Sequence, residues 1–157
     1  MFFSLSAKNC ANILEEMVEI PELSTFLTAV GVAGLVDVLN SEGRFTFFPP
    51  NNDAFARIPS QILYSYLEPK NAVQLKALVS RHIVPNMTLT VFNLLDWENR
   101  KYRTLETLGG ETIMVYPQDV IPENRGYKRI KSLTGKANTI ADGWSCNGNF
   151  HIIDSVL

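Results

Sequence analysis

The chain has 157 residues, of which 46% are apolar and 19% are charged, and its formal net charge is −2. These values are typical of one folded domain with a substantial core. The basic residues form no cluster, which argues against a nucleic-acid partner. No apolar run reaches the roughly 18 residues that are needed to cross a bilayer, so we expect no direct membrane span.

The first half of the chain has the periodicity of helices. From Ile13 to Ile20 apolar residues recur about every 3.6 positions, and Asn12 with Glu15 makes a capping pair in front of them. Pro21 ends that helix and can open the next one. The same pattern predicts helices over residues 23–30, 35–39 and 60–67, and one that starts at 69 and ends at 84–85.

One short segment combines a strand, its end and the start of a helix. Its aromatic run favours a buried strand, and two prolines end that strand because neither can donate to a sheet ladder. The three polar residues that follow the prolines can each cap a helix that begins at Ala54. The segment reads Phe45-Thr46-Phe47-Phe48-Pro49-Pro50-Asn51-Asn52-Asp53-Ala54-Phe55.

The second half of the chain has strand patterns. Gly109-Gly110 and Asn147-Gly148 are typical of hairpin turns, and for the second pair we expect a positive φ. Helices that come first and strands that come later indicate an α+β fold rather than alternating βαβ units. The candidate strands are residues 88–95, 102–108, 112–116, 128–133, 137–140 and 150–157.

Two segments resemble the signatures of the fasciclin-like domain family. Residues 46–55 are similar to Thr-Val-Phe-Ala-Pro-Thr-Asn-Asp-Ala-Phe without a gap, and residues 147–157 are similar to Asn-Gly-Val-Val-His-Val-Ile-Asp-x-Val-Leu. The likeness spans residues 9–157. It implies a β-wedge packed against several N-terminal and central helices, with 1–8 as a flank and 9–157 as a single domain. The signature residues that it assigns to the fold are Thr46, Phe48, Pro50, Asn52, Asp53, Phe55, Asn147, Gly148, His151 and Asp154.

The resemblance also implies a function. Fasciclin-like domains are non-enzymatic adhesion modules of secreted or cell-surface proteins, often within longer multi-domain chains, and they bind a protein or extracellular-matrix partner without a cofactor or metal. A carbohydrate- or lipid-binding domain is the alternative. An enzyme is the third and weakest hypothesis. The chain has only two histidines and contains no HExxH, P-loop, GxSxG or zinc-site spacing.

Four residues are candidates for the interaction surface. The segment 78–85 matches a family segment whose Tyr-His pair is linked to integrin engagement in animal members, and here it contains Arg81 and His82. Because Arg81 replaces the Tyr, integrin binding is in doubt. His82 can instead be a core residue that bonds to the turn 51–53. Trp97 and Arg100 are the other two candidates, since Trp and Arg are enriched at binding hot spots, although Trp97 can also cover the core.

Cys10 and Cys146 lie near opposite ends of the chain, and their spacing fits no zinc or redox motif. They are either two small buried apolar residues or a disulfide that ties the N-terminus to the last strand. Such a disulfide would stabilise the fold by roughly 4–5 kcal/mol and needs an oxidising compartment. Asn86, in Asn86-Met87-Thr88, is a candidate glycosylation site. Together these features favour a secreted glycoprotein.

Overall fold

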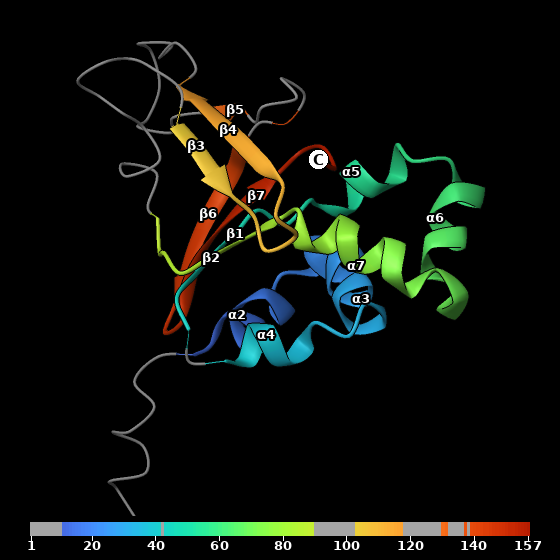
Figure 1. Ribbon diagram of the computed structural model, residues 1–157, viewed down its shortest axis with the longest axis horizontal. Coiled ribbons are helices and arrows are strands. Elements are labelled where there is room, and N and C mark those ends of the chain that lie inside the picture. The colour runs from blue at the N-terminus through green and yellow to red at the C-terminus, as the bar shows by residue number, and fades with distance from the viewer. Residues whose placement is uncertain (1–10, 42, 90–102, 118–129, 132–136, 138) are drawn as a thin grey trace, which may run out of the picture.

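The computed structural model describes residues 11–41, 43–89, 103–117, 130–131, 137 and 139–157. These residues form helices that pack against strands, so the fold class is α+β, as predicted (Figure 1). The helical elements are α2 (Ile13–Val18), η1 (Pro21–Leu23), α3 (Ser24–Val32), α4 (Val36–Asn40), α5 (Asn52–Ala56), α6 (Ser60–Leu67), η2 (Pro69–Asn71) and α7 (Ala72–Ser80). The strands are β1 (Phe45–Phe47), β2 (Ile83–Pro85), β3 (Arg103–Glu106), β4 (Thr112–Pro117), β5 (Ile130–Lys131), β6 (Thr139–Ser145) and β7 (Gly148–Ile153).

The main sheet has the strand order β2-β1-β7-β6. Strand β1 runs antiparallel to β2 and parallel to β7, and β7 runs antiparallel to β6. In the parallel pair Phe45 lies opposite Gly148, and Phe47 lies opposite Phe150. The two signature segments, which are far apart in the sequence, therefore lie side by side at the centre of this sheet.

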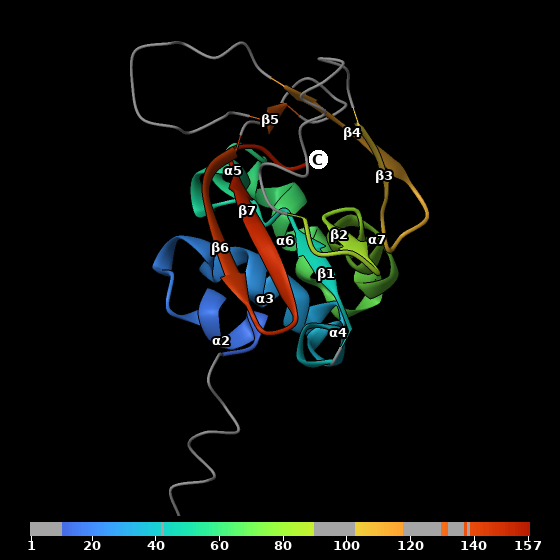
Figure 2. The same cartoon turned by 90° about the vertical axis from the view of Figure 1, so that its left-hand side faces the viewer.

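Helices cover one face of the main sheet (Figure 2). Phe47 and Phe150 extend from neighbouring strands into this helical core, where Phe26 and Leu75 meet them from α3 and α7. The core closes because each helix contributes one apolar stripe. Its buried members are Ile13, Met17, Leu23, Phe26, Ala29, Val30, Ala33, Leu35, Leu39, Phe45, Phe47, Phe55, Leu75, Val79, Ile83, Phe150 and Ile152.

The second sheet, with the order β3-β4-β5, covers part of the opposite face. Phe48, which follows β1, and Ile153 at the end of β7 pack with Leu105 of β3 and Val115 of β4 in a second apolar cluster. A cavity of about 10 Å³ lies in this inter-sheet core, with Phe48, Val115, Ile153 and Leu157 in its lining. That volume is enough for only about one water molecule.

Most of the predicted helix limits are confirmed. Asn12 and Glu15 form a capping box at the start of α2. Pro21 is in the first turn of η1. Asn51 caps α5, because its side chain accepts a hydrogen bond from the Ala54 N–H at 2.9 Å. These limits were predictable because each depends on residues only a few positions apart.

Several strand limits differ from the prediction. Residues 83–85 form β2, where an end to the preceding helix was expected, and 88–89 lie outside any strand. Residues 90–95 lie outside the described part of the chain. Strand β6 continues to Ser145 instead of stopping at 140, and β7 ends at Ile153 instead of 157.

Gly148 does not take the positive φ that the sequence predicted. Its role is spatial instead, since a Cβ at this position would lie 2.4 Å from the carbonyl oxygen of Phe45. Glycine therefore allows β7 to approach β1 closely at the start of their pairing. The other predicted turn does use a left-handed glycine, because Gly110 has a φ of +83°.

Candidate interaction site

The polar signature residues hold separate parts of the backbone together. The Thr46 hydroxyl donates to the carbonyl of Met87 and accepts from the N–H of Leu89, both at 2.9 Å. Asn52 accepts from the Thr25 N–H at 3.0 Å and donates to the carbonyl of Pro21 at 3.1 Å. Thr46 thus fixes the segment after β2, and Asn52 attaches α5 to the start of α3.

Asn147 is the most connected of these residues. Its side-chain amide donates to the carbonyls of Leu39 and Ser41 at 2.7 and 3.0 Å, and its Oδ1 accepts from the Ile13 N–H at 2.8 Å. Its own carbonyl accepts from the Phe45 N–H at 3.1 Å. The side chain therefore satisfies buried backbone groups at the start of α2 and the end of α4, which a role as a turn residue alone does not predict.

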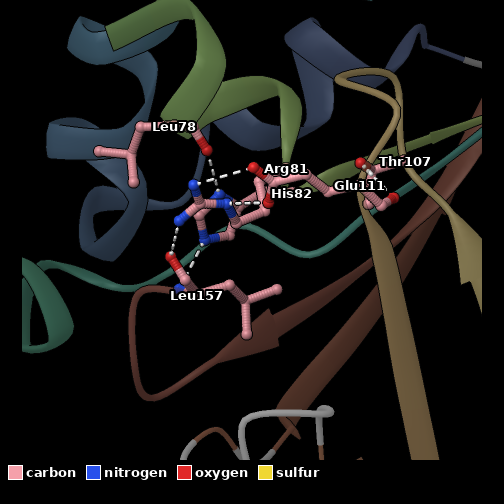
Figure 3. A network of polar contacts seen from close by, with 6 residues as sticks. All are labelled: Leu78, Arg81, His82, Thr107, Glu111 and Leu157. Carbon is pink, nitrogen blue, oxygen red and sulfur yellow. Dashed lines mark hydrogen bonds and ion pairs between the residues drawn. The ribbon is translucent and has the colours of Figure 1, made fainter. Parts of the chain in front are cut away.

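His82, one of the predicted interaction residues, is 1% exposed and lies after the end of α7 (Figure 3). Its Nδ1 lies 2.8 Å from the carbonyl of Leu78, and the N–H of Leu157 lies 3.0 Å from its Nε2. A carbonyl can only accept and an N–H can only donate, so the ring is neutral with its proton on Nδ1. The expected partner, the turn at 51–53, is not the one that the ring contacts.

Burial lowers the pKa of His82 to about 4. Desolvation is the main cause, because the charged ring loses its hydration when it is buried. The bond to the Leu78 carbonyl acts in the opposite direction, and the positive charge of Arg81 lowers the pKa further. At neutral pH His82 is therefore an uncharged core residue.

Arg81 makes its contacts within the domain. Its Nε lies 2.6 Å from one carboxylate oxygen of Glu111, and its Nη2 donates to the other at 3.2 Å. Its Nη1 donates to the main-chain oxygen of Leu157 at 3.0 Å. Figure 3 shows this guanidinium between the β3–β4 hairpin, which carries Glu111, and Leu157. Arg81 thus links three segments, and two-thirds of its side chain is covered.

His151 is also buried, with 1% of its surface exposed. Its Nε2 lies 2.8 Å from the carbonyl of Leu89, and its ring tilts against that of Phe48 with 5.6 Å between the ring centres. Its Nδ1 has no hydrogen-bond partner among the described residues. Burial lowers the pKa of His151, while the Leu89 carbonyl and the charge of Asp142 act against that shift.

The main sheet is open to solvent at one end of the face that carries His151. Trp144 of β6 pairs with Asn149 of β7, two residues before His151, so the three side chains share that face. Trp144 is 71% exposed, Asp142 is exposed, and Asn149 is half-buried. We call Asp142, Trp144 and Asn149 the open end of the sheet.

The remaining predicted residues are scattered. Trp97, Arg100 and Cys10 lie outside the described part of the chain. Asn86 is exposed, with a φ of 67°, in the turn after β2. Cys146 follows β6, and its N–H donates to the carbonyl of Ala11 at 2.9 Å. The structure therefore brings Arg81 and His82 together and places Asn86 in a separate turn.

The described residues also bear on membrane insertion and on metal binding. None of their helices is both long and apolar enough to cross a membrane. Within the same residues, no group of three His, Cys, Asp or Glu side chains could hold a metal ion.

Comparison with known proteins identifies the family. Residues 21–157 match the fasciclin domain, so the chain belongs to the fasciclin domain family. A solved FAS1 domain pair from the insect cell adhesion molecule fasciclin I has the same fold, with a TM-score of 0.79 and 18% identity over 94% of this chain and 50% of that one.

Several relatives are similar in sequence. The chain is 34% identical to protein sll1483 of Synechocystis sp. over 85% of the chain and 66% of that protein. It is 32% identical to protein sll1735 of the same organism over 93% of the chain and 96% of that protein. Transforming growth factor-beta-induced protein ig-h3 of Sus scrofa is 28% identical over 93% of the chain, which spans only 19% of ig-h3.

Proposed function

We propose that the chain is a non-enzymatic interaction module that acts outside the cell and binds a protein or extracellular-matrix partner. Family membership supports the proposal, as does a fold shared with a domain pair of a cell adhesion molecule. The observation that carries it is the exposure of Trp144, 71%, at the open end of the sheet. A partner that covered this side chain would gain a large apolar contact.

The open end has the chemistry of a binding hot spot. A tryptophan offers a large rigid surface with a polar N–H, and such residues supply much of the energy of many interfaces. Trp144 stands on β6, and Asp142 and Asn149 add polar groups on the same face. This combination of an apolar centre and a polar margin is typical of protein interfaces.

A carbohydrate partner is the second candidate. An exposed indole ring flanked by the carboxylate of Asp142 and the amide of Asn149 can stack on a sugar and bond to its hydroxyls. The inter-sheet cavity gives less support to lipid binding, because its roughly 10 Å³ cannot hold an acyl chain. We therefore place the glycan alternative at the same open end as the protein partner.

The extracellular setting is part of the proposal. The bond from the Cys146 N–H to the Ala11 carbonyl brings the residue after Cys10 against Cys146, which supports a disulfide between the two cysteines. We propose that Asn86, exposed in its turn, carries a glycan and that residues 9–157 form one domain of a longer protein. An intact mass equal to that of the fully reduced chain would contradict the disulfide.

The function can be tested by binding to defined surfaces. Purified wild-type chain, Trp144→Ala and Tyr64→Ala would be applied to a panel of matrix proteins, a glycan array and lipid vesicles. Tyr64 of α6 is a matched control, because it is 68% exposed and lies outside the open end. We expect saturable binding to a matrix protein that Trp144→Ala weakens at least about tenfold and Tyr64→Ala leaves unchanged.

Other outcomes decide between the candidates. Binding to glycans alone, lost in Trp144→Ala, would replace the protein partner by a carbohydrate. Binding that both variants retain would remove the open end from the interface. Circular dichroism and urea unfolding would check that each variant is folded.

A further inference from the structure

Side chains from the ends of two helices hold the segment that follows β7. Asp154–Leu157 has no regular structure. Arg57, the residue that ends α5, donates from Nη1 to the carbonyl of Asp154 at 3.0 Å. Arg81, the residue that ends α7, donates to the main-chain oxygen of Leu157, and His82 accepts the Leu157 N–H, both at 3.0 Å. Three side chains thus bind this main chain at both ends.

We propose that Arg57, Arg81 and His82 form a clamp that fixes Asp154–Leu157, and that acid opens this clamp at its His82 end. The clamp uses side chains because the sheet pairing of β7 stops at Ile153. Without the clamp, the backbone groups of Leu157 that it satisfies would need water or another partner.

The chemistry of acid opening follows from the hydrogen bonds. The Nδ1 of His82 already carries a proton for the Leu78 carbonyl, so a second proton must bind at Nε2. That proton points at the N–H of Leu157, which is itself a donor, and the hydrogen bond between them is lost. The new cation also lies beside the guanidinium of Arg81.

The groups around His82 offer the cation little compensation. Phe26 of α3 meets the ring edge-on at 6.2 Å between ring centres, and Phe48 bonds to the carbonyl of His82 through its main chain. Among the described side chains, the charged group that acts on the ring is Arg81, and the carboxylate of Glu111 is engaged by that guanidinium. Opening the segment lets the imidazolium reach water, so protonation favours the open form.

Opening would change the inter-sheet core. The side chain of Leu157 packs against this core and lines its cavity together with Phe48, Ile113 and Ile153. When Asp154–Leu157 leaves, the apolar residues at that end of the core meet solvent. The clamp therefore couples proton concentration to the exposure of an apolar site beside Leu157.

Amide hydrogen exchange measured by NMR on the full chain tests the clamp directly. The protection factor of the Leu157 amide should fall about tenfold per pH unit from pH 6.5 to about 4, roughly 300-fold in total, because the open form has the ordinary histidine pKa. Below pH 4 it should level off. The Phe48 amide, which donates to the His82 carbonyl at 2.8 Å, should stay better protected at every pH.

Three further measurements keep the test decisive. In His82→Gln the pH dependence of Leu157 protection should vanish. In Arg81→Gln, which leaves His82 in place, Leu157 protection should fall at neutral pH, and it should level off at a higher pH because the charge of Arg81 no longer lowers the His82 pKa. Low urea should not alter Leu157 exchange, because local opening exposes little surface. Leu157 protection that is constant with pH in the wild-type chain, or that tracks Phe48 in both pH and urea, would overturn the proposal.

Discussion

The two faces of the main sheet are covered to different extents. On one face the helices cover Phe47 and Phe150 and form a large buried core with them. On the other face the second sheet covers the Ile153 end, and Trp144 remains 71% exposed at the opposite end. The signature segments supply much of the covered regions, whereas Asp142 and Trp144, the two exposed side chains of the open end, lie outside those segments.

The largest expected effect comes from the helical face. Phe47→Ala removes a ring that is 0% exposed, so we expect a loss of about 3–5 kcal/mol in the free energy of unfolding. Urea unfolding at pH 7 measures it. Trp144→Ala is the matched aromatic control from the other face, and its change should stay within about 0.5 kcal/mol. Similar losses in both variants would remove the contrast between the faces.

Loss of the polar side chain of Asn147 should lower the free energy of unfolding almost as much. Asn147→Ala leaves the carbonyls of Leu39 and Ser41 and the N–H of Ile13 without their partner, which we expect to cost about 3 kcal/mol. Thermal and urea unfolding both report this loss. Asn147→Asp keeps the acceptor for Ile13 but cannot donate to the carbonyls. An Asn147→Ala variant as stable as the wild-type chain would contradict the bridging role.

Acid should destabilise the fold through the buried histidines. His82 has a folded pKa of about 4, below the ordinary 6.5, so the neutral ring is the form that folding favours. Its contribution is complete above pH 6.5 and is lost as the pH falls towards 4, which amounts to about 3 kcal/mol. The lowered pKa of His151 acts in the same direction. Urea midpoints from pH 7.5 to 4.5 that do not fall would contradict this.

The smallest expected effect is a difference in unfolding free energy between two glycine-to-alanine variants. A Cβ at Gly143 of β6 would lie 2.2 Å from the ring of Phe150, so Gly143→Ala should cost about 1–3 kcal/mol. Gly31 of α3 has no atom within 4 Å of that position, so Gly31→Ala should gain about 0.5–1 kcal/mol. Unfolding free energies of the pair give the two signs. Equal effects would show that the contact with Phe150 does not decide the outcome.

The features that could be predicted from the sequence are those that depend on residues close together in the chain. The cap of α2 depends on Asn12 and Glu15, three positions apart, and the cap of α5 on Asn51 and Ala54. The order of helices and strands, and the family, followed from such patterns and from the two signatures. These features are local, so they could be predicted without knowledge of the fold.

Long-range contacts could not be predicted in this way. The Nε2 of His82 accepts from Leu157, 75 positions away, and no periodicity connects the two residues. Residues 141–145 lie beyond the predicted end of the strand at 140, yet they continue β6 because β7 pairs with them. Arg81 was expected at a binding surface, but Glu111 and Leu157 occupy its guanidinium. Tertiary packing therefore determined the roles of the site residues.

The most direct measurement compares Trp144→Ala with Arg81→Gln in binding to the same partner surface. If the open end binds the partner and Arg81 acts within the domain, Trp144→Ala should weaken binding at least about tenfold while its urea midpoint stays at the wild-type value. Arg81→Gln should bind like the wild-type chain and lose protection at the Leu157 amide. The opposite pattern, with binding lost in Arg81→Gln and retained in Trp144→Ala, would contradict the account.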